Sequence, residues 1–162
     1  MTKRSAGILP YRGSRKGLQV LLVHPGGPFW QRRDLGAWSI AKGEYDESEL
    51  PEAAARREFS EETGWEPKGT LLTLGQLRQR GGKLITAFAF EGDFDTARLR
   101  SNLFEMEWPP RSGRVQSFAE VDRGEWLDLA LARDKLVVGQ RPFLDRLVAS
   151  VQRSRGCLLI AR

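Results

Sequence analysis

A stretch in the first half of the chain carries a cluster of carboxylates that constrains the fold more than any other feature. Glu58, Glu61 and Glu62 fall on one face of a predicted helix, within an arc of roughly 100°. Like charges at this spacing repel one another, so the cluster is either a solvated charged face or a site for a hard cation. Mg²⁺ is bound by a few carboxylates and keeps its other positions for water and phosphate oxygens. The cluster therefore points to metal-assisted phosphate chemistry.

The residues around the cluster form a longer pattern, G-x5-E-x7-R-E-U-x-E-E-x-G-U, in which U is apolar. The matching positions are Gly43, Glu49, Arg57, Glu58, Phe59, Glu61, Glu62, Gly64 and Trp65. This pattern resembles the signature of the Nudix hydrolases, and its full register favours the cation site over the charged face. Trp65 departs from the signature, since the last apolar position is more often aliphatic. The resemblance implies an α/β/α sandwich around a mixed β-sheet and cleavage of nucleoside diphosphates linked to another group.

The composition limits the class of protein. The 162 residues suit a single domain, 1–162, with one sizeable core. A net charge of +5 favours polyanionic partners, nucleotides included, without selecting among them. The single cysteine, Cys157, excludes an internal disulfide and fits a reducing, cytoplasmic compartment. We find no apolar run of about 18 residues and no apolar leader, so we expect neither a membrane span nor a signal peptide.

Strand and helix signals alternate along the chain, which predicts an α/β architecture. Pro51 suits a first helical turn and Gly64 suits a C-terminal cap, while Ser48 is the expected donor of the N-terminal cap. Helices are expected at about 51–63 and about 142–152. Strands are expected at residues 5–11, 18–24, 38–40, 71–78, 83–91 and 115–118, with a last one opening at Trp126. Residues 93–113 are predicted to be an irregular insertion or loop.

The acids and the resemblance together predict a metal site. We expect Gly43, Glu58, Glu61, Glu62 and Glu120 to hold Mg²⁺, for which Mn²⁺ can substitute. A glycine at position 43 lets backbone carbonyls turn toward the metal without a side chain in the way. Metal ions offset the charge of the phosphates, orient them and lower the pKa of bound water.

Catalytic roles are expected for Arg57, Glu58, Glu61 and Glu120. Arg57 orients a glutamate of the cluster and can pair with Glu61, four residues further on. Glu58 or Glu120 takes the proton of the attacking water. Nudix hydrolases often place an extra acid on the loop before the last strand, and Glu120, six residues before Trp126, is our choice. Its alternatives are Glu125, Glu105 and Glu107, and an exposed loop glutamate without a role carries almost equal weight.

Three further residues are candidates for substrate binding. Ala37 to Gly43 is similar to the run W-x-x-P-K-G in a Nudix branch that includes dinucleoside polyphosphate hydrolases, although Ala41 replaces the proline. Lys42 either neutralises a phosphate or is a solvated lysine. Trp30 and Trp108 lie in predicted loops and are the tryptophans we expect to stack on a base. The only histidine, His24, is expected to end a strand, with no ligand set around it.

The leading functional hypothesis is Mg²⁺-dependent hydrolysis of a pyrophosphate bond, with a nucleoside triphosphate or a dinucleoside polyphosphate as substrate. The alternative in another substrate class is removal of pyrophosphate or a cap from RNA 5′ ends, but no clustered Lys/Arg tract or aromatic RNA-reading motif supports it. A third hypothesis is a non-catalytic domain that binds a nucleotide. The sequence leaves a monomer and a homodimer equally open.

Overall fold

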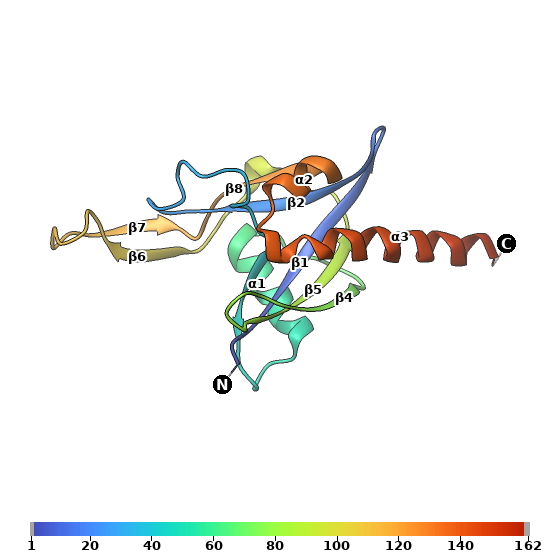
Figure 1. Ribbon diagram of the computed structural model, residues 1–162, viewed down its shortest axis with the longest axis horizontal. Helices are drawn as coiled ribbons and strands as arrows, with labels where there is room; N and C mark the ends of the chain where they lie inside the picture. The colour runs from blue at the N-terminus through green and yellow to red at the C-terminus, as the bar shows by residue number, and fades with distance from the viewer. Residues whose placement is uncertain (1, 161–162) are drawn as a thin grey trace.

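The computed structural model describes residues 2–160, with side chains as far as residue 156, and shows a mixed sheet between helices (Figure 1). The main sheet has six strands. Five of them follow one another in the order β4-β5-β1-β2-β8, and the sixth, β3, pairs with β1. The strands are β1 (Arg4–Ser14), β2 (Gly17–Pro25), β3 (Ala41–Tyr45), β4 (Leu72–Arg78), β5 (Leu84–Glu91), β6 (Leu103–Glu107), β7 (Val115–Ala119) and β8 (Val121–Asp128). The helices are α1 (Pro51–Thr63), α2 (Leu129–Lys135) and α3 (Pro142–Ile160), with the 3-10 turns η1 (Thr96–Arg98) and η2 (Val138–Gln140).

Strand β1 organises the sheet, because it pairs along both of its edges. It runs parallel to β5 from Arg4 to Tyr11, and it is antiparallel to β3 near its start and to β2 near its end. Every residue of β1 from Ser5 to Tyr11 is therefore buried. The predicted strand at 18–24 is confirmed as part of β2, and its residues from Val20 to His24 are likewise buried, as in a strand covered on both faces.

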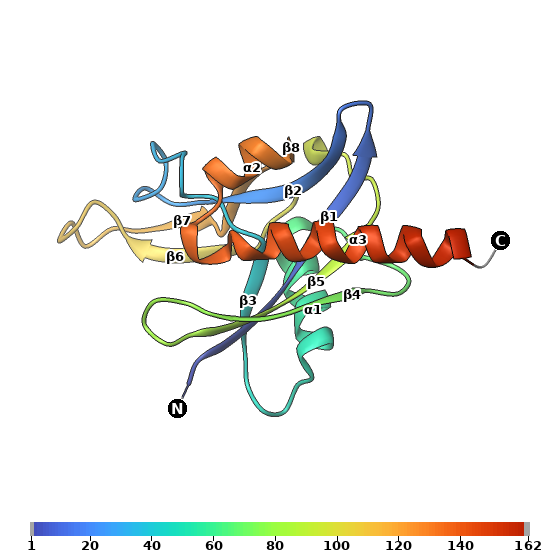
Figure 2. The ribbon, with the colours of Figure 1, turned by 45° about the vertical axis from the view of Figure 1, so that its right-hand side comes forward.

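Two apolar layers cover the sheet, one on each face. Ala54, Ala55 and Phe59 of α1 pack with Ile8 and Leu21 in one buried cluster. In the other buried cluster, α2 and α3 supply apolar side chains that pack on residues of β1, β2 and β5; they are Ala132, Phe143, Leu144, Leu147 and Val151. Figure 2 shows α3 crossing the sheet on the side opposite α1. The α/β/α sandwich around a mixed sheet is thus confirmed.

Several element boundaries differ from the sequence-based predictions. A strand was predicted at 38–40, but Trp38 and Ser39 make only isolated bridges, to Leu136 and Val23. The strand β3 begins at Ala41 instead and includes Gly43. Trp126 does not open the last strand but lies within it, opposite Leu21. Helix α3 continues to Ile160, well beyond residue 152. Because the apolar residues that predicted this helix mark only the part that packs on the sheet, they did not show its full length.

The largest correction concerns residues 93–113, which are not irregular. They contain η1 and β6, and β6 pairs with β7 in a separate two-stranded sheet, here called the ribbon. Phe104 stands opposite Phe118 in the ribbon, and exposed and half-buried side chains alternate along β6. The ribbon projects from the body of the domain in Figure 1. The prediction was wrong because only one face of the ribbon is partly covered, which leaves a weak alternation in the sequence.

None of the helices within residues 2–160 combines the length and the apolar character that a membrane crossing requires.

Candidate active site

Helix α1 carries the carboxylate cluster, and its ends are set by local sequence. Pro51 occupies the first turn, and Gly64 ends the helix in the left-handed conformation with φ 77°, donating its N–H to the carbonyl of Ser60. Both assignments confirm the predicted helix. The N-cap is Leu50 and has no side-chain hydrogen bond, whereas Ser48 bonds to the carboxylate of Asp46. The expectation that Ser48 caps the helix was therefore wrong. Ser48 donates its backbone N–H to the Asp46 carboxylate in a tight turn before the helix instead.

Gly43 provides the space in which Glu58 lies against the sheet. Gly43 pairs with Ala6 of β1, and a Cβ added at Gly43 would lie only 1.9 Å from the carboxyl carbon of Glu58. Glu58 is 9% exposed, so its carboxylate is packed against the backbone of β3. The glycine is thus required for close packing of a catalytic candidate. Its carbonyl as a metal ligand stays a prediction.

Arg57 ties three acids together on the outer side of α1. Its Nε and Nη2 donate to the two carboxylate oxygens of Glu49, both at 2.9 Å. Its Nη1 lies 2.7 Å from Glu58 Oε1 and 3.4 Å from Glu61 Oε2. The hydrogen bond from Arg57 holds the pKa of Glu49 below its usual range. This geometry is the one expected of an arginine that orients glutamates.

Glu62 is the most perturbed acid of the cluster. The backbone N–H of Lys42 donates to Glu62 Oε2 at 3.0 Å, which fixes the carboxylate beside β3. Burial raises the pKa of Glu62 to about 8, although the nearby Lys42 charge lowers it, and the negative charges of Glu58 and Glu120 raise it further. Burial also lowers the pKa of the Lys42 ammonium, with a further contribution from Lys83. Glu62 is a partly buried acid close to the negative charges of Glu58 and Glu120, which makes it a strong candidate for cation binding.

Glu120 reaches the same place from the other end of the chain. It lies between β7 and β8, donates its backbone N–H to the carbonyl of Asn102 and accepts one from Gly26, both at 2.9 Å. Its pKa is raised by burial, then by the charges of Glu58 and Glu61. Glu62, Glu120 and Lys42 line one small cavity of about 120 Å³. The structure therefore brings Glu120 to the cluster, as proposed from the sequence.

The alternatives to Glu120 lie elsewhere. Glu125 is in β8, with its carboxylate 3.9 Å from the ammonium of Lys135. Glu105 and Glu107 are exposed on the ribbon. None of the three is among the residues that shift the pKa of Glu62 or of Glu120.

The carboxylates are a suitable donor set for a hard cation, yet within residues 2–156 no three acidic, histidine or cysteine side chains form a ready metal-binding group. The reason is visible in the contacts, because Glu58 and Glu61 turn their oxygens to Arg57 and Glu62 turns one to the Lys42 amide. The oxygens are hard ligands, and burial together with repulsion from the other acids raises the pKa of Glu62 and of Glu120. In donor type and in charge, the cluster fits Mg²⁺.

The predicted base-stacking residues lie outside the small cavity of Glu62 and Glu120, on two neighbouring segments. Trp30 is 37% exposed in the loop after β2, with the guanidinium of Arg33 5.5 Å from its ring. Trp108 lies at the end of the ribbon and packs edge-to-face on Phe29, with ring centroids 5.4 Å apart. Trp30 is thus exposed and Trp108 is half-buried, and their role in substrate binding stays a prediction.

His24 is a residue that sequence reasoning underestimated. It is fully buried at the end of β2, where its Nδ1 lies 2.9 Å from Asp122 Oδ1 and its Nε2 lies 2.6 Å from the carbonyl of Arg33. These two contacts fasten the loop that carries Trp30 to β8, two residues from Glu120. The sequence showed only that this histidine ends a strand. It could not show that His24 contacts Asp122 and the Arg33 carbonyl, because neither partner is indicated by the local sequence.

The fold and the acidic site define a domain with a carboxylate-rich helix beside a mixed sheet, and comparison with known proteins agrees. The model of the NUDIX domain family matches residues 1–147, so the chain belongs to the Nudix family. No curated protein sequence matches the chain significantly.

Solved structures share the fold at low sequence identity. The Ap4A hydrolase of C. elegans, in a binary complex, has a TM-score of 0.62 and 20% identity, covering 91% of this chain and 98% of its own. The NUDIX domain of Shewanella oneidensis NrtR, in complex with ADP ribose, has a TM-score of 0.63 and 17% identity, covering 93% and 89%. The MutT protein of Methanosarcina mazei Go1 has a TM-score of 0.58 and 19% identity, covering 92% and 94%. At this identity the similarity establishes the fold.

Proposed function

We propose that this Nudix protein hydrolyses a pyrophosphate bond in a nucleoside diphosphate-linked substrate, with Mg²⁺ as cofactor. The observation that carries the proposal is the convergence of Glu58, Glu61, Glu62 and Glu120, from two distant segments, on one partly buried place. Carboxylates concentrated in this way are costly unless a cation shares their charge. Retention of every acid of the sequence signature favours an enzyme over a binding domain.

Glu58, Glu61, Glu62 and Glu120 are the residues that would hold Mg²⁺. When bound, the metal supplies charge neutralisation for the phosphates and a lowered pKa for water. Arg57 keeps Glu58 and Glu61 oriented through contacts of 2.7 and 3.4 Å. The Lys42 amide does the same for Glu62. The site is thus held in shape by groups that need not touch the substrate.

The proton of the attacking water goes to Glu58 or to Glu120. Glu120 fits this task well because burial and the neighbouring acids raise its pKa above the ordinary value, which makes it a better base. The ammonium of Lys42 borders the same cavity and can neutralise a phosphate oxygen. The reaction is a direct substitution at phosphorus, without a covalent intermediate.

The substrate is proposed to be a small nucleotide, either a nucleoside triphosphate or a dinucleoside polyphosphate. The structural neighbour solved as an Ap4A hydrolase supports the dinucleoside polyphosphate class. The exposed ring of Trp30 and the half-buried ring of Trp108 offer surfaces on which a base can stack.

A substrate panel tests the proposal. Nucleoside triphosphates, dinucleoside polyphosphates, ADP ribose and triphosphorylated RNA are incubated with the protein and Mg²⁺, and the products are identified by mass spectrometry. We expect cleavage of a small nucleotide at a pyrophosphate bond, lost in EDTA and restored by Mg²⁺ or Mn²⁺. Preferential cleavage of the RNA would select the alternative substrate class, and full activity in EDTA would contradict the metal site.

A further inference from the structure

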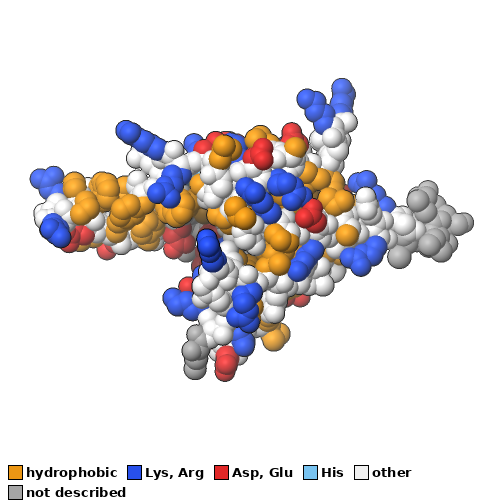
Figure 3. All heavy atoms as spheres, in the orientation of Figure 1, with side chains coloured by type: hydrophobic (Ala, Val, Ile, Leu, Met, Phe, Trp, Pro, Cys, Tyr) orange, Lys and Arg blue, Asp and Glu red, His pale blue; other side chains and the backbone are white. Residues whose placement is uncertain are grey.

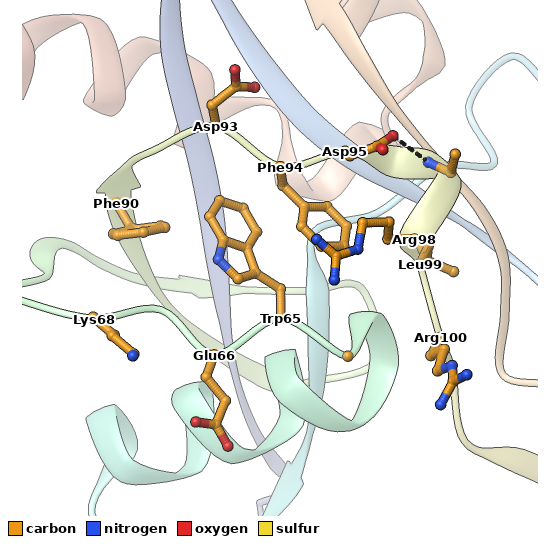
Figure 4. Close-up of a pocket in the computed structure, with 12 residues that line it drawn as sticks. Trp65, Glu66, Lys68, Phe90, Asp93, Phe94, Asp95, Arg98, Leu99 and Arg100 are labelled. Atoms are coloured by element: carbon orange, nitrogen blue, oxygen red, sulfur yellow. Dashed lines mark hydrogen bonds between the residues drawn. The ribbon is translucent and has the colours of Figure 1, made fainter.

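A second, larger cavity lies at the carboxyl end of α1 (Figure 4). It has a volume of about 1090 Å³ and is formed by the connection after α1, the end of β5 and the segment Asp93–Arg100. None of the residues predicted to hold metal, perform catalysis or bind substrate lines it. This cavity is therefore separate from the proposed active site.

Aromatic rings form one part of the cavity wall. Trp65 stacks on Phe94 with ring centroids 4.7 Å apart and an interplanar angle of 6°, and Phe90 meets Trp65 edge-on at 5.1 Å. All three rings are half-buried, so they have a packed side and an accessible one. A flat ring brought into the cavity can extend this cluster by stacking or by an edge contact.

The charges around the cavity are unbalanced. Lys68, Arg98 and Arg100 line it, and none of them has an ion-pair partner within the described part of the chain. Two of the lining acids are engaged elsewhere, since Asp93 lies 2.7 Å from Arg12 and Asp95 accepts a hydrogen bond from the Ala97 amide. Glu66 is the third lining acid, and the hydrogen bond to Asp95 leaves the charge of that carboxylate in place. Among the described residues, the cavity thus presents three unpaired cations, Lys68, Arg98 and Arg100, against two unpaired carboxylates, Asp95 and Glu66.

We propose that this cavity binds a nucleoside monophosphate or a closely similar phosphate-bearing aromatic. The base lies against Trp65 and Phe94, and the phosphate lies between Arg98 and Arg100. The planar guanidinium group donates to phosphate in a two-pronged geometry, so the two arginines supply both charge and orientation. Figure 4 shows Arg98 and Arg100 on the same segment as Phe94, with the Arg98 side chain beside the Phe94 ring and the Arg100 side chain pointing away from the rings. Both side chains are exposed at the surface, so the phosphate site requires Arg100 to turn toward Arg98.

The site also has a structural connection to the catalytic acids. The Arg100 amide donates to the carbonyl of Thr63, and the Asn102 amide donates to the carbonyl of Glu61, both at 2.9 Å. The Asn102 carbonyl accepts the amide of Glu120. The segment that lines the cavity therefore continues directly into the support of Glu120, although binding itself does not depend on the proposed reaction.

The test separates this cavity from the active site by removing both catalysis and metal. Glu62→Gln protein in EDTA is titrated with adenosine 5′-monophosphate, adenosine and inorganic phosphate, using calorimetry and the indole resonance of Trp65. We expect saturable binding of the monophosphate, with a shifted Trp65 signal, and weaker binding of either fragment. The double substitution Arg98→Gln, Arg100→Gln should weaken monophosphate binding by about tenfold or more. The matched control, Arg111→Gln with Arg114→Gln on the ribbon, should leave it unchanged.

Other results would overturn the proposal. Absence of saturable monophosphate binding, or binding that is weakened by Lys42→Ala and not by the double substitution, would remove the ligand from this cavity. Equal affinity for inorganic phosphate and the monophosphate, together with no effect of Phe94→Leu, would show an anion site without recognition of a base. Circular dichroism of each variant checks that the fold is retained.

Discussion

The two regions of the molecule that carry candidate site residues differ in how their side chains are held. In the box region, meaning α1 and β3, the acids are partly buried and each is fixed by an arginine or a backbone amide. In the ribbon, β6 and β7 pair with each other, and hydrophobic side chains gather along it at the surface (Figure 3). Leu103 and Val115 are each 66% exposed. Carboxylates that lie close together repel one another, so they must be fixed by hydrogen bonds and ion pairs. Exposed apolar side chains on a surface strand need no such fixing.

Glu120 joins the two regions. It follows the last residue of the ribbon and is bound through its backbone to Asn102 and Gly26, yet its pKa responds to the box acids. If the box region holds the catalytic acids and the ribbon is only a surface, substitutions should lower the rate of hydrolysis most in the box region, less at Glu120 and least on the ribbon.

The largest effect is expected for Glu62→Gln. The amide keeps the shape and can still accept the Lys42 hydrogen bond, but it removes the charge that the metal needs. Hydrolysis should fall by several orders of magnitude while the circular dichroism spectrum stays unchanged. Trp108→Ala on the ribbon is the matched comparison, and an equal loss in that variant would break the distinction between the regions.

Glu120→Gln is expected to lower kcat by about a hundredfold if this residue is the base. Glu125→Gln provides the control, since Glu125 precedes Trp126 in the same strand but faces Lys135. Steady-state kinetics and thermal melting are measured for both. Equal and small effects of the two substitutions would make Glu120 an ordinary surface acid and leave Glu58 as the base.

Gly43→Ala tests the steric account of the box region. The added methyl would lie 1.9 Å from the Glu58 carboxyl group, so Glu58 must move. We expect a destabilisation of about 1–3 kcal/mol, measured by urea unfolding, together with a loss of activity. Gly13→Ala is the control, because a Cβ there meets nothing within 4 Å. A Gly43→Ala protein as stable and active as the control would contradict the packing seen at Glu58.

The raised pKa of Glu62 predicts how stability depends on pH without metal. The folded-state pKa of about 8 lies above the ordinary value of 4.5, so between these values the folded protein binds more protons than the unfolded chain. Metal-free wild-type protein should therefore lose stability as the pH rises from 4.5 to 8. Glu62→Gln should remove this part of the pH dependence, and saturating Mg²⁺ should reduce it. Melting curves of both proteins at several pH values, in EDTA and in Mg²⁺, measure the effect. If the melting temperatures of the two proteins in EDTA change with pH in parallel, Glu62 ionises as easily in the folded protein as in the unfolded chain, which would contradict the raised pKa.

The smallest effect is expected on the ribbon. Trp108→Ala removes one edge-to-face pair with Phe29, worth about 1 kcal/mol or less at a half-buried position. If Trp108 stacks on a base, KM should rise while kcat changes little. A large loss of stability would mean that the ribbon belongs to the folded core rather than to the surface.

Much of the box region could be predicted from sequence because its determinants are local. Pro51, Gly64 and the spacing of the acids fix the helix and its charged face within one short segment. The position of Glu120 required the resemblance to a known family, since no spacing connects it to residues so far away. The ribbon was missed because its strands are short and only partly covered.

Other features depend on tertiary contacts that sequence does not express. The need for a glycine at 43 arises from the Glu58 carboxylate, which arrives from a different element. His24 is held by Asp122 and by the carbonyl of Arg33, which are distant in the chain or belong to the backbone. Trp65 departs from the aliphatic preference of the signature, and in the structure its ring stacks on Phe94, which likewise belongs to another segment.

Hydrolysis in ¹⁸O-labelled water tests the central claim most directly. With Mg²⁺ and the substrate identified by the panel, direct attack of water at phosphorus should place a single labelled oxygen on one product of a broken pyrophosphate bond. Simple phosphate monoesters should stay intact under the same conditions. Rapid cleavage of monoesters, or label distribution that requires a phosphorylated residue of the protein, would contradict both the mechanism and the role of the carboxylate cluster.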